Sequence, residues 1–99
     1  IQPVDLHSGK EIAEYIYRQA RLAHKTNDLT AAKLFYEQAI HLNGQNPWYF
    51  GANSALNLGY LAQEQKDYEQ ARKYFELALS YKKHEYKNSI DGKARSALE

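Results

Sequence analysis

The sequence has no cysteine, no methionine and only two prolines among its 99 residues. The lack of cysteine excludes disulfides, zinc–thiolate sites and thiol nucleophiles. No apolar stretch approaches the roughly 18 residues that a membrane-spanning helix needs, so we expect no membrane partner. The 13 basic and 12 acidic residues leave a net charge of +1. Bulk electrostatics therefore gives no reason to expect a nucleic-acid partner.

The missing initiator methionine indicates that the chain is a processed product or a piece of a longer protein. Its first residues lack the basic start and apolar core of a signal peptide. The absence of cysteine does not define a compartment, so the localisation stays unknown, with the cytoplasm favoured. The length predicts a single domain over residues 1–99 with one modest core.

Motifs for catalysis are also missing. The four histidines form no i, i+4 pair and no HExxH motif, and the five glycines are scattered rather than gathered in a phosphate-binding loop. No serine lies in the context of a nucleophile elbow. We therefore expect no catalytic residues, no metal ligands and no cofactor, and we do not expect an enzyme.

The sequence contains an internal repeat with an offset of about 39 residues. The matching positions cluster at helical spacing, and no stretch alternates apolar and polar residues as a strand would. The repeat therefore predicts an all-α fold of two similar halves. The identical pairs are Ala13 with Ala52, Leu22 with Leu61, Ala23 with Ala62, Asp28 with Asp67, Ala32 with Ala71, Glu37 with Glu76, and Ala39 with Ala78.

The first half reads as two helices. Ser8 and Glu11 form a capping-box pattern that starts a helix running to about residue 25. Asp28 is a good N-cap for the next helix. That helix ends where Gly44 can take a left-handed C-cap conformation.

The second half repeats this arrangement. Asn46 is the expected N-cap of a helix over about 47–65, one turn longer than the first helix. Asp67 caps a helix that ends near residue 82 or 83. A last helix is expected over 85–98, and Gly92 within it costs about 1 kcal/mol relative to alanine, so this helix should be the least stable.

Both halves carry the small-residue pattern of a known repeat. The second half has Ala55-x2-Leu58-Gly59-x2-Ala62, followed by Ala71-x3-Phe75 and Ala78, and the first half has Ala20, Ala23, Ala32-x3-Tyr36 and Ala39 at the matching places. This pattern resembles the tetratricopeptide repeat (TPR) family, although the offset is about 39 residues where the family period is 34. The five extra residues fall at 43–48.

The resemblance implies a right-handed α–α superhelix of TPR-like helical hairpins with about five helices. Repeat one would span about 8–44, repeat two about 47–83, and a capping helix about 85–98. Small residues let the two helices of a hairpin approach closely, and the aromatic residue fills the wedge between them.

The resemblance also implies a function, which is non-catalytic binding of a peptide or partner protein on the concave face lined by the first helix of each repeat. Asparagine can donate to and accept from a peptide backbone, tyrosine offers flat apolar area, and arginine and lysine can pair with carboxylates. The residues of this chain at the positions that line the concave face in the family are Glu14, Tyr17, Arg21, Lys25, Asn53, Asn57, Tyr60 and Glu64, together with His24 and Leu56.

Other interpretations stay open. The polar residues on the first helix of each repeat can simply form a solvent-exposed face without a partner. Some TPR domains hold the C-terminal carboxylate of chaperones, but only Asn57 falls on a matching position, while Tyr17 and Arg21 depart from that clamp and Lys87 would have to substitute. Two repeats are few for an independent stack, so the main alternative is a structural module that self-associates as a homo-oligomer through its repeat ends.

Two aromatic segments have competing explanations. We expect Trp48 and Phe50 to pack the long turn onto the second helix, and the alternative is an exposed patch for a partner. The segment 81–87 is locally basic with tyrosine near its ends, a combination that also occurs where proteins bind nucleic acids. A solvated turn is favoured because Glu85 and Asp91 dilute its charge.

Overall fold

The structure is a computed structural model, and it describes residues 9–82, 84 and 86–99. This part of the chain contains helices and no strand, which confirms the all-α prediction. None of its helices is both long and apolar enough to cross a membrane. The helices, in order, are α1 (Gly9–Lys25), α2 (Leu29–Asn43), α3 (Tyr49–Glu64), α4 (Tyr68–Ser80) and α5 (Lys87–Leu98).

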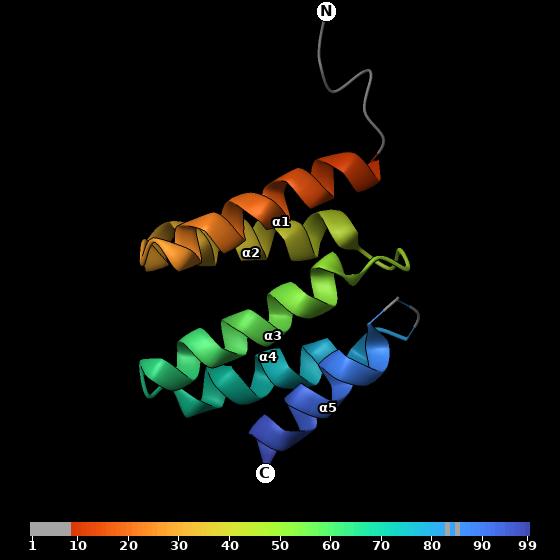
Figure 1. Cartoon of the computed structure of the whole chain (residues 1–99). Coiled ribbons are helices and arrows are strands. Elements are labelled where there is room, and N and C mark those ends of the chain that lie inside the picture. Colours follow the sequence, from red (N-terminus) through yellow and green to blue (C-terminus); the bar gives the residue numbers. More distant parts are fainter. Residues whose placement is uncertain (1–8, 83, 85) are drawn as a thin grey trace, which may run out of the picture.

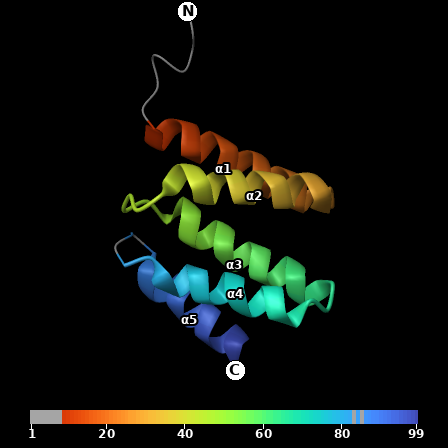
Figure 2. The ribbon, with the colours of Figure 1, turned by 180° about the vertical axis from the view of Figure 1, so that it is seen from behind.

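The helices form two hairpins that stack side by side, followed by a single helix. α1 packs on α2, α3 packs on α4, and the hairpins meet through α2 and α3. Figures 1 and 2 show α1, α3 and α5 along one side of the stack and α2 and α4 along the other. We call the first side the helix-A face, because it carries the first helix of each hairpin.

The turns inside the two hairpins are equivalent at the predicted offset. Asn27 and Lys66 have positive φ angles of 66° and 63°, which places both in the left-handed region that ends a helix in a Schellman motif. Asp28 and Asp67 then cap α2 and α4, and each carboxylate accepts a hydrogen bond of 3.3 Å from the N–H three residues later. Both predicted caps are confirmed.

The small residues lie where the repeat requires them. Ala32 and Ala71 are both buried, and each donates its N–H to the carbonyl of the capping aspartate in its own repeat. One turn later, Tyr36 and Phe75 fill the wedge of each hairpin and are at most 1% exposed. Burial of these rings against alanine surfaces stabilises each hairpin.

The turn between the hairpins corrects two predictions. Asn46 does not cap α3, because its Nδ2 donates instead to the carbonyl of Asn43 at 3.0 Å. α3 begins at Tyr49 after Trp48, which makes no side-chain capping bond. As a result α3 has 16 residues and is not longer than α1, which has 17.

Gly44 differs from its prediction in one torsion angle. Its φ is +52°, as a glycine cap requires, but its ψ is −130° rather than the value of a left-handed helix. This pair of angles matches the first central residue of a type II′ turn. The N–H of Asn46 closes that turn on the carbonyl of Asn43 at 3.0 Å.

Asn43 joins this turn to α3, a role that the sequence analysis missed. Its side chain is fully buried, and its Nδ2 donates to the carbonyls of Gly44 and Asn46 at 3.1 and 3.2 Å. Its Oδ1 accepts the N–H of Gly51 at 3.0 Å. One side chain thereby satisfies two carbonyls of the turn and one N–H that the start of α3 leaves unpaired.

The aromatic segment after this turn packs into the core, as expected. Phe50 is 2% exposed, and Trp48 is half-buried beside it at 6.3 Å between ring centroids. The same cluster contains Tyr36 and Ala39 of α2, but the ring that Phe50 meets on the first hairpin is Tyr17 of α1, at 5.6 Å. The segment therefore closes the stack over both helices of the first hairpin.

α5 covers the end of the second hairpin, where it packs on α4 and α3. Ile90 and Ala94 are its buried apolar residues, while Tyr86 and Leu98 are 52% and 37% exposed at its ends. The helix begins two residues later than predicted, and α4 ends two or three residues earlier. The predicted capping box at Ser8 and the expected boundaries at 83 and 85 lie outside the described residues.

Candidate functional site

The candidate residues differ in how far they are open to a partner, although all lie on α1 and α3. One group is exposed, one is half-buried and two residues are buried. The exposed side chains are Arg21, Lys25 and Glu64; the half-buried ones are Glu14, His24, Asn53, Asn57 and Tyr60; the buried ones are Tyr17 and Leu56, and Leu56 belongs to the core rather than to the open face.

Tyr17 belongs to the packed edge between α1 and α3 rather than to the open face. It is 5% exposed, and its ring meets Tyr49 and Phe50 at 5.6 Å each. Its hydroxyl accepts hydrogen bonds from Nδ2 of Asn53 and from Nη1 of Arg21, the latter at 3.0 Å. The expectation that this ring offers flat area to a partner is therefore corrected: Tyr17 links the two helices.

The same hydroxyl fixes the position of a cation. Its hydrogen bond raises the pKa of the Arg21 guanidinium, which stays charged at every physiological pH. The guanidinium carbon lies 5.9 Å from the centroid of the Tyr17 ring, within cation–π range. Arg21 is thus held in place by its neighbour while the rest of its side chain is exposed.

Glu14 is already engaged. Its carboxylate pairs with Arg18 at 2.6 Å, one turn further along α1. An exposed pair at this spacing contributes about 0.3–0.5 kcal/mol, so a partner can displace it at small cost.

A first groove lies between α1 and α3, with a volume of about 450 Å³. It carries two of the cations of α1 and one amide of α3. Nδ2 of Asn57 donates to the carbonyl of Asn53 at 2.8 Å, which orients the amide along α3. The groove is lined by Arg21, Leu22, His24, Lys25 and Asn57. His24 Nδ1 lies 3.0 Å from the hydroxyl of Tyr36, so this imidazole is tied to the core beneath.

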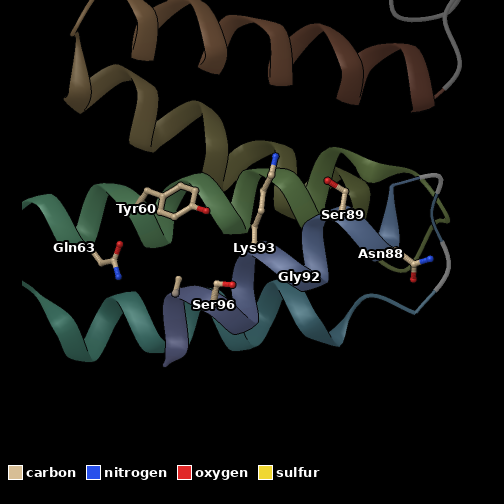
Figure 3. Close-up of a pocket in the computed structure, with 8 residues that line it drawn as sticks. Tyr60, Gln63, Asn88, Ser89, Gly92, Lys93 and Ser96 are labelled. Atoms are coloured by element: carbon tan, nitrogen blue, oxygen red, sulfur yellow. The ribbon is translucent and has the colours of Figure 1, made fainter.

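A second groove of about 670 Å³ lies between α3 and α5 (Figure 3). Tyr60 and Gln63 form its α3 side, and the ring of Tyr60 rests on Phe75 at 5.5 Å between centroids. The α5 side is built from residues that recur every three or four positions: Asn88, Ser89, Gly92, Lys93 and Ser96. This α5 side was not predicted from the sequence, although the spacing of polar residues on the predicted last helix was a signal for it.

Lys87 does not supply a free cation for a carboxylate clamp. Its Nζ donates to Oδ2 of Asp91, a residue that is only 5% exposed. At the same end of α5, Tyr86 meets Tyr49 edge to face at 4.9 Å and so connects α5 to α3. Burial raises the pKa of the Tyr49 hydroxyl, which therefore stays protonated and able to donate.

The part of the chain that the structure describes brings together no group of three or more histidine or carboxylate side chains that could hold a metal ion. The chemistry that the helix-A face can offer is hydrogen bonding, apolar contact with tyrosine, and positive charge from arginine and lysine.

Comparison with protein families gives a match over most of the chain. The tetratricopeptide repeat family matches twice, at residues 13–46 and at residues 52–85, so the two matches begin 39 residues apart. No curated protein and no solved structure gives a match. The two matches cover the hairpins α1–α2 and α3–α4 and their equivalent turns. The chain therefore belongs to the tetratricopeptide repeat family.

Proposed function

We propose that the chain binds an extended peptide segment of a partner protein along α1 and α3 of its helix-A face. Tetratricopeptide repeats are generally protein–protein interaction modules, and this supports the class of function. The choice of face rests on the Tyr17 hydroxyl, which accepts hydrogen bonds from Arg21 of α1 and from Asn53 of α3. The bond from Asn53 holds α1 and α3 together beside a groove of about 450 Å³.

The groove chemistry suits a peptide. Oδ1 of Asn57 accepts no hydrogen bond within the described part of the chain, so it is available to a peptide N–H. Arg21 and Lys25 provide two cations at the same end, which suits a carboxylate on the partner. Most of the helix-A face is preformed, so binding requires little ordering of this chain.

The test is peptide-array capture by the wild-type chain and by a double variant, Asn57→Ala with Lys25→Ala. We expect the captured peptides to be lost or strongly weakened. A matched control, Gln45→Ala with Lys73→Ala, removes one amide and one cation from exposed positions outside the groove and should leave capture unchanged. Equal capture by the wild type and the groove variant would overturn the proposal.

A second candidate function is structural stacking at the N-terminal end. There α1 and α2 form an apolar groove of about 520 Å³ that includes Ile12, Ile16, Leu34 and Leu42. Leu34 and Leu42 are 57% and 39% exposed. An exposed apolar surface of this kind is where a neighbouring repeat would pack in a longer array.

Sedimentation velocity of the isolated chain tests this second function. We expect concentration-dependent association of the wild type through this end. The double variant Leu34→Glu with Leu42→Glu should remain a monomer. Identical sedimentation of the two proteins would contradict stacking through this surface.

A further inference from the structure

Three of the five glycines have a reason within the chain. Gly44 has a positive φ. A Cβ on Gly51 would lie 2.8 Å from the Tyr81 hydroxyl, and one on Gly59 would lie 2.4 Å from the Phe75 ring. Gly9 has no such reason, but it is the first residue of α1, where a glycine costs little.

Gly92 has no such reason. It lies in the middle of α5, has no positive φ, and a Cβ built on it would meet nothing within 4 Å. Glycine inside a helix disfavours that helix relative to alanine. The chain thus carries a destabilising residue at a position where its own fold would accept a side chain.

The position of Gly92 in the fold suggests a role in binding. Gly92 lines the groove between α3 and α5, and Figure 3 shows it on α5 between Asn88 on one side and Lys93 and Ser96 on the other. Without a Cβ, the backbone of α5 is open to close approach from the groove. A glycine is found where a ligand or another chain comes close to the backbone.

The charge of the groove restricts the occupant. Among the described residues that line it, Lys93 is the only charged one, and none is a carboxylate. Within the described part of the chain, Lys93 takes part in no ion pair. The other polar groups are the amides of Gln63 and Asn88 and the hydroxyls of Ser89 and Ser96, which can pair with the N–H and C=O groups of an extended backbone.

We propose that the α3–α5 groove is a second contact site, which takes an acidic extended segment of the partner protein with its backbone directly against Gly92. This inference rests on the proposed binding function of the helix-A face. It adds α5 to the binding surface and specifies the charge of the segment. Lys93 pairs with an acidic side chain of that segment, and Tyr60 forms the opposite wall.

The test uses two pools of fluorescein-labelled octapeptides, one rich in Asp and Glu and one with Lys at the same positions, and follows their anisotropy. The wild type should bind the acidic pool in preference to the basic pool. Gly92→Ala should weaken that binding by about tenfold, the effect of adding a methyl group to a packed contact. The same variant should raise the melting temperature, because alanine favours the helix.

Two variants of α5 that each remove one cation distinguish binding in the groove from nonspecific attraction by the positive charge of the helix. Lys93→Ala removes the cation that lines the groove and should weaken binding about fivefold at low ionic strength. Arg95→Ala removes an exposed cation of the same helix that does not line the groove, and should have no effect.

Three outcomes would overturn the inference. One is equal binding of the acidic pool by the wild type and Gly92→Ala. Another is preference for the basic pool, and the third is no binding of either pool. If Asn57→Ala weakens binding while Gly92→Ala does not, the α1–α3 groove alone is the site, and the proposed function survives without this inference.

Discussion

Gly59 of α3 lies directly against the ring of Phe75 in α4. A Cβ built on Gly59 would stand only 2.4 Å from Cε1 of that ring. The equivalent positions in the first hairpin, 39 residues earlier, are Ala20 and Tyr36, and both are fully buried. The second hairpin therefore requires glycine at a position where the first one holds alanine.

This relationship gives opposite predictions for one substitution at two sites. Gly59→Ala should lower the free energy of unfolding by about 2 kcal/mol, because the methyl group forces apart two packed helices. Gly92→Ala, where the methyl group meets nothing, should raise it by up to about 1 kcal/mol. Urea unfolding monitored by circular dichroism measures both. A stabilised Gly59→Ala variant would contradict the packing described for the second hairpin.

Asn43 should be the polar side chain whose loss matters most for the link between the hairpins. Asn43→Ala leaves the N–H of Gly51 and two turn carbonyls without their partner, and should cost about 2–3 kcal/mol. Asn46→Ala removes one part-buried hydrogen bond of an exposed residue and should cost less than about 1 kcal/mol. Equal urea midpoints for the two variants would show that Asn43 does not hold the turn.

Ser54 is expected to be a destabilising residue in the wild-type chain. It is fully buried in α3, and its hydroxyl has no hydrogen-bond partner within the described residues. Ser54→Ala should therefore raise the free energy of unfolding by about 1 kcal/mol, since it removes an unsatisfied polar group and keeps the volume nearly constant. The exposed Ser89→Ala is the control and should change stability by less than about 0.5 kcal/mol. A loss of stability in Ser54→Ala would contradict the prediction.

Stability should decrease on acidification because of His84. Both of its ring nitrogens are shielded from solvent and lack a hydrogen-bond partner in the described part of the chain. Burial lowers the pKa of His84 below its ordinary value of 6.5, Asp91 opposes this shift, and Lys87 adds to it. The unfolded chain then binds the proton more tightly than the folded one. The stability present above pH 6.5 is lost as the pH falls towards the folded-state pKa.

Urea midpoints between about pH 7.5 and 5.5 measure this dependence. His84→Gln should flatten the decrease, while the exposed His41→Gln should leave it as it is in the wild type. If the wild type and both variants lose stability equally with falling pH, titratable groups other than His84 cause the decrease.

Local patterns in the sequence predicted the hairpins well. The spacing of Ala32 and Ala71 and the caps at Asp28 and Asp67 depend on contacts within a few residues or within one repeat. Such contacts recur at the same offset, so the repeat itself reports them. Apart from Arg21, which lies one turn along α1, the partners of Tyr17 come from the other hairpin, and those of Asn43 come from the long turn and α3, so no local pattern encodes them.

The long turn explains why the rest of the site was not predictable. It places Phe50 against Tyr17, and this contact buries a ring that the repeat pattern alone assigns to the open face. Asn46 looks like an N-cap in the sequence, but its amide is used inside the turn. The orientation of α5, and with it the groove at Gly92, depends on how that helix packs on α3 and α4.

Backbone amide chemical shifts of the isotopically labelled chain, titrated with a peptide captured on the array, locate the binding surface residue by residue. We expect the perturbed amides to belong to α1, α3 and α5, with the largest shifts near Asn57 and Gly92. Shifts confined to α2 and α4, or to the apolar end around Leu34 and Leu42, would contradict this expectation.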